Sequence, residues 1–188
     1  MKLFKAIVLL TSSILATSAM ASEDIKTKFD KPSSESLFVA NDGEVMLTFL
    51  SKEAAYSNDI YLAGTSGKIL NNQTANVNQQ FSLGSFQAGT ELIFSMFVNN
   101  TSYTFFNGKA ENNLDKILHS AYEIGSGNSI IVGFEDLFNG GDRDYDDLVF
   151  SLTNVSVKNL VTPVPEPETY AMLLAGLLLL GAVKRRKH

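Results

Sequence analysis

Between residues 35 and 157 the chain alternates short apolar runs with polar turn residues. β-Branched and aromatic residues fill the runs, and Asn, Asp and Gly bound them, which is typical of β-strands. The expected strands are 35–40, 44–50, 59–64, 90–99, 102–106, 128–135 and 147–157. In the last run Leu148, Phe150 and Leu152 share parity, so we expect them to face the core. The pattern predicts an all-β fold, a single β-sandwich of the jelly-roll kind.

Two stretches interrupt this pattern. Residues 70–80 are rich in Asn and Gln, and we expect a solvated surface loop there, with ligand binding as the lesser alternative. Residues 107–128 fit either a short helix or a strand, and Asn107–Gly108 at their start is a hairpin-type turn signal.

The N-terminus has the three parts of a secretory signal peptide. Lys2 and Lys5 precede a short, mostly apolar stretch, and Ala19-Met20-Ala21 is a small-x-small cleavage site. We therefore expect export through the secretion translocon and cleavage by signal peptidase between Ala21 and Ser22. A buried N-terminal helix is the alternative.

The C-terminus combines a proline-rich segment, a short apolar stretch and a basic tail. Residues 170–183 carry no charge, but as a helix they would span only about 21 Å of a hydrocarbon core about 30 Å thick. The basic residues 184–187 would hold the tail on the cytoplasmic side. An ordinary single-span anchor, tolerated by bilayer thinning, is one interpretation.

The order of these parts resembles the PEP-CTERM sorting signal of exported bacterial proteins, with Pro165, Glu166 and Pro167 as its motif. The resemblance implies that exosortase recognises this motif, cuts near it and passes the protein to the cell surface or the exopolysaccharide matrix. The predicted organisation is a signal peptide at 1–21, a folded domain at 22–160, a proline-rich linker at 161–169 and a short transmembrane sorting helix with its basic tail at 170–188.

Composition narrows the chemistry of the mature domain. Residues 22–165 hold 9 basic and 18 acidic residues, a formal charge of −9, which argues against nucleic acid as a partner. The chain has no cysteine and only two histidines, one of them in the tail. It therefore lacks the ligands of an ordinary zinc site, and a lone His119 is most often a packed or surface residue. The 64–68 loop lacks the spacing of a phosphate-binding loop.

The sequence GFEDLFNGGDRDYDDLVF is the main chemical signal. It gathers six carboxylates around one arginine, beside apolar strands. The six candidate metal ligands are Glu135, Asp136, Asp142, Asp144, Asp146 and Asp147. Like charges this close would cost a large part of a domain's stability of about 5–15 kcal/mol unless a cation offsets them. Because all candidate donors are hard oxygens, Ca²⁺ is the expected ion.

The spacing departs from an EF-hand, since Asp147 stands where that loop needs glycine and Thr153 where it needs glutamate. The segment resembles instead the FEDL–GGDxDYNDLVF motif of a family of exported bacterial domains of unknown function, with Asp146 in place of the usual Asn. That resemblance implies a calcium site and an exported setting.

We therefore expect a non-enzymatic, Ca²⁺-stabilised extracellular module of the biofilm matrix or cell surface, structural or adhesive. The alternatives are a Ca²⁺-dependent glycan-binding module, with Tyr145 or Phe138 beside the ion, and a polysaccharide-acting enzyme using a carboxylate pair. A plain acidic turn without an ion is the simplest alternative. Exopolysaccharide or surface glycans are the expected partners after export.

Overall fold

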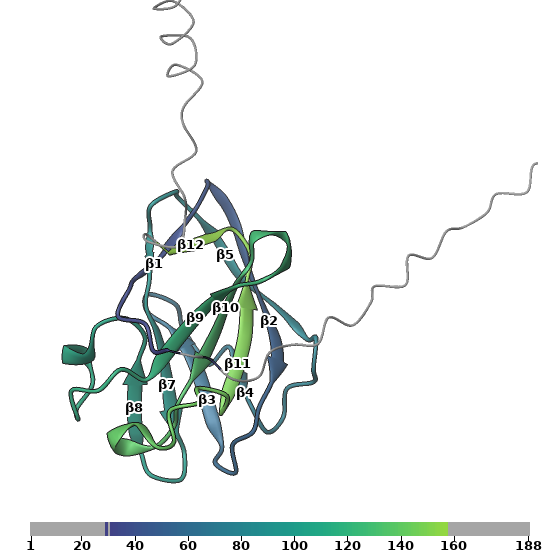
Figure 1. Cartoon of the computed structure of the whole chain (residues 1–188). Helices are drawn as coiled ribbons and strands as arrows, with labels where there is room; N and C mark the ends of the chain where they lie inside the picture. Colours follow the sequence, from purple (N-terminus) through teal and green to yellow (C-terminus); the bar gives the residue numbers. More distant parts are fainter. Residues whose placement is uncertain (1–28, 30, 158–188) are drawn as a thin grey trace, which may run out of the picture.

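The computed structural model describes residue 29 and residues 31–157 (Figure 1). In these residues the chain forms twelve β-strands and three short 3-10 helices, without an α-helix. The strands are β1 (Leu37–Val39), β2 (Gly43–Ser51), β3 (Asn58–Leu62), β4 (Leu70–Asn71), β5 (Gln80–Phe86), β6 (Glu91–Leu92), β7 (Phe94–Val98), β8 (Tyr103–Phe106), β9 (Ser120–Ile124), β10 (Ile130–Phe134), β11 (Leu148–Leu152) and β12 (Val155–Val157). The 3-10 helices are η1 (Ala110–Asn112), η2 (Ser126–Asn128) and η3 (Phe138–Gly140).

Three segments predicted from the sequence lie outside the described residues. These are the signal peptide with its cleavage site at Ala21 and Ser22, the linker with Pro165–Pro167, and the sorting helix. Within the described part, no helix is long and apolar enough to cross a membrane.

The strands form three antiparallel sheets, which confirms the all-β prediction (Figure 1). The largest sheet has the order β5-β2-β11-β10-β9. A second sheet has the order β4-β3-β7-β8, and a third has the order β12-β1-β6. Neighbours such as β3 and β7 are far apart in the sequence, so much of the hydrogen bonding is long-range.

All three sheets contribute side chains to one hydrophobic core. Phe94 of β7 packs on Phe150 of β11 with ring centroids 5.3 Å apart, which joins the four-stranded and five-stranded sheets. Leu148, Phe150 and Leu152 are fully buried in this core, as their alternation predicts. The opposite face of β11 is also covered, because Val149 packs in a second small cluster with Tyr145.

The polar stretches are more ordered than the sequence suggests. Asn71 and Asn72, which we expected in a solvated loop, are buried. The backbone N–H of Asn58 donates to Asn72 Oδ1 (2.8 Å), and the N–H of Asn72 donates to the Asn58 carbonyl (3.0 Å), so this segment fixes the start of β3.

The prediction of a hairpin turn at Asn107–Gly108 is wrong. β8 pairs only with β7, and the chain continues through η1 into β9, which belongs to the other sheet. Asn107 is instead buried, and its Oδ1 accepts a hydrogen bond from the N–H of Phe94 (2.8 Å). The side chain of Asn107 therefore ties the end of β8 to the start of β7.

Candidate functional site: an acidic cluster between β10 and β11

The pairing of β10 with β11 sets the position of the acidic residues. Phe134, the last residue of β10, is opposite Leu148, the first residue of β11. Glu135 and Asp136 therefore leave the sheet beside the point where Asp147 enters it. The connecting loop contains η3, and Phe138 in η3 stacks on Tyr103 of β8 at 4.9 Å, so the loop lies near the edge of the four-stranded sheet (Figure 1).

Five of the six predicted ligands come together, in two groups that share Glu135. The inner group is Glu135, Asp136 and Asp147, and the outer group is Glu135, Asp142 and Asp144. In each group the carboxylate oxygens lie within 4.8 Å of one another. Oxygens bind Ca²⁺ at about 2.4 Å, so two ligands on opposite sides of one ion are about 5 Å apart, and either group is compact enough to hold one ion.

The sixth predicted ligand, Asp146, lies in neither group. Its side chain is buried, and its backbone carbonyl accepts a hydrogen bond from the N–H of Glu53 (3.0 Å). Asp146 therefore ties the end of the loop to the segment after β2.

The loop is shaped to enclose the Glu135 carboxylate. The N–H of Leu137 donates to Oε1 and the N–H of Arg143 donates to Oε2, both at 3.2 Å. Gly141 has φ +40°, and a Cβ there would overlap the Glu135 carboxylate. Glycine is therefore required at this position for two reasons, the left-handed backbone and the close approach.

The exposure of the carboxylates falls from the outside of the cluster to the inside. Asp142 is exposed and Asp144 is half-buried, whereas Glu135 and Asp136 are only 1% and 3% exposed. Among the residues that the structure describes, no lysine or arginine forms an ion pair with the inner group. The most buried carboxylates are thus those without a basic partner in this part of the chain.

The electrostatics of the inner group favour a bound positive charge. Burial, followed by repulsion from Asp136 and Glu135, raises the pKa of Asp147 to about 8. Burial is also the main cause that raises the pKa of Glu135 and of Asp136, and hydrogen bonds with the Asp147 carboxyl partly offset it. All three carboxyls therefore have pKa values raised above the ordinary range, mainly because burial penalises their charged form.

Two residues that sequence reasoning did not assign to the site contact it. Asn58, at the start of β3, is fully buried and donates from Nδ2 to Asp136 Oδ2 (2.7 Å). Its Oδ1 is buried and has no hydrogen-bond partner. The contact joins residues 78 positions apart, so no local sequence pattern could have revealed it.

The second residue is His119, which is fully buried, as a packed lone histidine is expected to be. Its ring stacks on Phe105 with centroids 3.7 Å apart. Nδ1 lies 2.9 Å from the carbonyl oxygen of Glu135, and Nε2 lies 2.9 Å from Asp115 Oδ2. Because Asp115 also accepts the N–H of Asn139 (2.8 Å), these two side chains brace the loop against β9.

The donor set fits a calcium ion. All candidate ligands are oxygens, an orphaned amide oxygen lies against the cluster, and the Gly141 backbone leaves room for the shared carboxylate. Glu135, Asp136 and Asp147 would hold the ion at the inner position, and Asp142 and Asp144 would hold it with Glu135 at the outer position. A bound Ca²⁺ would supply fixed positive charge.

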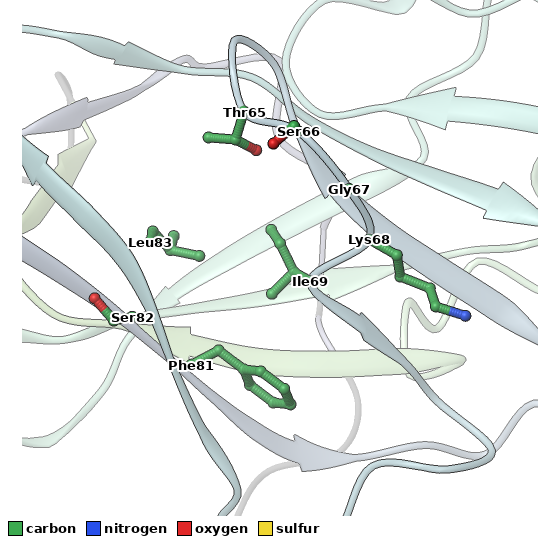
Figure 2. Close-up of a pocket in the computed structure, with 8 residues that line it drawn as sticks. All are labelled: Thr65, Ser66, Gly67, Lys68, Ile69, Phe81, Ser82 and Leu83. Carbon is green, nitrogen blue, oxygen red and sulfur yellow. The ribbon is translucent and has the colours of Figure 1, made fainter.

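A separate surface pocket lies away from these acids, between the β3–β4 loop and β5. Figure 2 shows its lining, and the pocket has a volume of about 280 Å³. The residues around it are Thr65, Ser66, Gly67, Lys68, Ile69, Phe81, Ser82 and Leu83. No carboxylate belongs to this lining, so the pocket offers no pair for acid–base chemistry.

Comparison with known proteins adds two matches. Residues 86–154 match the domain of unknown function DUF4114, and residues 163–187 match the PEP-CTERM protein-sorting motif. The chain therefore carries a PEP-CTERM sorting motif at its C-terminus. PEP-CTERM proteins are exported, processed by exosortase and sorted to the cell surface, as the resemblance of the C-terminus implies.

The DUF4114 match places the acidic cluster within the matched region and Asn58 outside it. It begins at the end of β5 and ends just after β11, so it includes both strands that carry the cluster. No curated protein matches the chain.

Proposed function

We propose that this protein is a Ca²⁺-stabilised extracellular module, associated with the exopolysaccharide or biofilm matrix or with the cell surface, in a structural or adhesive role. The observation that carries the proposal is the inner group, in which Glu135 and Asp136 are buried and Asp147 is partly buried. No lysine or arginine among the described residues forms an ion pair with this group. The sorting motif supplies the extracellular setting.

Simple electrostatics supports the ion. Two unit charges about 4 Å apart repel by roughly 4 kcal/mol at an effective dielectric near 20. Three ionised carboxylates in one cluster would therefore remove much of a domain's stability of about 5–15 kcal/mol. Without an ion, protons relieve this repulsion until the pH rises through the raised pKa of Asp147, about 8. A bound divalent cation would relieve it with the carboxylates ionised.

We further infer a β-sandwich in which the four-stranded and five-stranded sheets are the two layers. The Phe94–Phe150 contact and the shared core support this arrangement. An ion between β10 and β11 would fasten the loop at one end of these layers. A rigid domain of this kind suits a protein that works outside the cell, where nothing in the chain provides a disulfide.

The second candidate is a Ca²⁺-dependent glycan-binding module. Phe138 favours it, because this ring is 38% exposed and lies on the loop that carries the cluster. Tyr145, the other expected aromatic, is only 1% exposed and packs in the second small cluster, so it offers no surface to a sugar. Any sugar platform would use Phe138 with Tyr103 beneath it.

A polysaccharide-acting enzyme is the weakest of the three candidates. A glycosidase needs two carboxyl groups that face a substrate cleft. The buried carboxyls here contact one another and backbone N–H groups. The pocket in Figure 2 is lined by other residues.

The decisive experiment compares the melting temperature of the full-length protein, purified in mild detergent, in EDTA, in Mg²⁺ and in Ca²⁺. Saturation at about 100 times Kd stabilises a protein by roughly 2.7 kcal/mol, which is a shift of several degrees at this size. We expect a rise specific to Ca²⁺. An unchanged melting temperature would leave the plain acidic turn as the better account.

Three variants locate the ion. Glu135→Gln should weaken Ca²⁺ binding most, because Glu135 belongs to both groups, and Asp144→Asn should weaken it through the outer group. Asp59→Asn is the matched control, since Asp59 is also buried but pairs with Lys68 (3.1 Å) outside both groups. The same loss in all three variants would mean that the site is misplaced.

A glycan array with and without chelator separates the two non-enzymatic candidates. Binding that requires Ca²⁺ and is lost in Phe138→Ala would favour the glycan-binding module. Absence of binding to sugars, with the thermal shift intact, would leave the ion a structural role.

A further inference from the structure

We propose that Asn58 is a ligand of the cation at the inner group, so that the ion joins β3 of the four-stranded sheet to the β10–β11 loop of the five-stranded sheet. This inference rests on the proposed Ca²⁺ site and extends it in two ways. It selects the inner group over the outer one, and it adds a ligand that lies outside the DUF4114 match.

The first observation is the state of the Asn58 amide. The side chain is 0% exposed, and its Nδ2 donates to Asp136 Oδ2 at 2.7 Å. Its Oδ1 is buried without a hydrogen-bond partner. An unsatisfied buried acceptor destabilises the fold, so such an atom needs an explanation.

The second observation is the position of this amide. Nδ2 and Oδ1 are attached to the same carbon, so the orphaned oxygen belongs to the amide that contacts the Asp136 carboxylate. Rotation about χ2 exchanges the two atoms, so the amide can present either one to Asp136. Without an ion the donor Nδ2 is favoured next to a carboxylate. With a cation between the two residues, the oxygen is favoured, because amide oxygens are ordinary Ca²⁺ ligands.

The backbone holds the amide in place for this role. The N–H and the carbonyl of Asn58 are both bonded to Asn72 (2.8 and 3.0 Å), which fixes the start of β3. The site would then have three carboxylates and one amide from two sheets, a set of oxygens that Ca²⁺ accepts. The outer group is more open to solvent, because Asp142 is exposed and Asp144 is only half-buried.

The alternative partner of Oδ1 is a buried water. A water would satisfy the oxygen with or without calcium, so the two accounts predict different responses to the ion. They also differ on substitution. A ligand can be replaced by another oxygen, whereas a residue that acts only through its Nδ2 donor cannot.

The test uses the full-length protein in mild detergent, with Ca²⁺ alone as the probe. Calorimetry gives the Kd for Ca²⁺, and melting temperatures are recorded in EDTA and in Ca²⁺, for wild type, Asn58→Leu, Asn58→Asp and Asn107→Leu. Asn107 is the matched control, since it is a buried asparagine whose amide is satisfied on both sides, by the N–H of Phe94 and by Tyr122 Oη.

We expect Asn58→Leu to raise the Kd for Ca²⁺ at least about tenfold. Asn58→Asp should lower the melting temperature in EDTA, because it adds a carboxylate beside Asp136. Ca²⁺ should then raise the melting temperature of this variant by more than it raises that of wild type. Asn107→Leu should lose stability equally in both buffers and keep the wild-type Kd.

Two results would overturn the inference while leaving the calcium site intact. One is a wild-type Kd in Asn58→Leu. The other is a rise in melting temperature with Ca²⁺ that is no larger in Asn58→Asp than in wild type. This second result also tests the inference if Asn58→Leu does not fold. If wild type itself binds no Ca²⁺, the proposed function fails first and this inference fails with it.

Discussion

At the scale of single residues, Asp147 is the group whose ionisation should control the ion-free protein. Its folded pKa of about 8 is far above the ordinary value of 3.8. A raised folded pKa contributes stability that is fully present below the ordinary value and is lost as the pH rises through about 8. Glu135 and Asp136 are shifted in the same direction.

The melting temperature in EDTA should therefore fall between about pH 5 and pH 8, while in Ca²⁺ it should change much less. Calcium competes with the proton, so its stabilising effect should grow with pH. Asp147→Asn imitates the protonated group and should flatten the profile in EDTA. A wild-type profile as flat as that of the variant would contradict the raised pKa.

Gly141 gives a second prediction at the same scale. Gly141→Ala should cost more than the roughly 1–2 kcal/mol of a left-handed residue alone, because the new Cβ would displace the Glu135 carboxylate. Gly127→Ala is the control, since Gly127 has φ +63° and open space around its Cβ position. Denaturant unfolding and Ca²⁺ titration of both variants test this. Equal losses, with Ca²⁺ binding retained, would refute the close approach.

At the scale of elements, the strands were predictable and their partners were not. Alternation placed Leu148, Phe150 and Leu152 in the core, because side-chain direction in a strand has a period of two. Sheet order depends on contacts between distant segments, which a local pattern does not encode. The same reason explains the wrong prediction at Asn107–Gly108, where the asparagine is buried and bonded to the N–H of Phe94.

The acidic site, too, could be predicted from the sequence only in part. Glu135, Asp136 and Asp147 could be expected to meet because one loop joins adjacent strands. Asp146 lies outside both groups although it is next to Asp147 in the sequence, and the contact of Asn58 with Asp136 joins residues 78 positions apart. Neither is visible without the fold.

Asp115 and His119 hold η3 against β9, and their contacts give a prediction at the scale of elements. Burial raises the pKa of Asp115, but hydrogen bonds from His119, Asn139 and Ile117 outweigh it and hold the pKa below its ordinary value. This stability is present above the ordinary pKa and is lost as the pH falls through the lowered one. At pH 7, Asp115→Asn should cost about 1–3 kcal/mol, as expected for buried bonds to a charged group.

Hydrogen exchange locates that loss. The amide of Asn139 should exchange faster in Asp115→Asn, because its acceptor is Asp115 Oδ2. The amide of Phe49, bonded to the Gln79 carbonyl far along the chain, is the internal control. An equal increase in exchange at both amides would mean that the variant destabilises the whole domain and that Asp115 does not hold the loop locally.

At the scale of the whole molecule, the sorting motif and the proposed calcium site occupy separate segments of the sequence. The sorting motif matches residues 163–187, whereas the carboxylates lie between residues 135 and 147. A protease that recognises a short extended segment needs the residues of that segment, and proline-rich stretches are extended and accessible. Removal of the motif should therefore stop processing without changing the ion site.

Replacing Pro165, Glu166 and Pro167 with alanine should leave the protein uncut in the membrane fraction, with a wild-type Ca²⁺ response. Glu135→Gln should show the converse, with normal processing and a lost Ca²⁺ response. Immunoblots of membrane and surface fractions, with melting curves of the purified proteins, measure both. Pro163→Ala, in the same proline-rich stretch but outside Pro165–Pro167, is the control for the linker. If Glu135→Gln also blocked processing, then folding outside the membrane would be a condition for sorting, and the two segments would act in sequence.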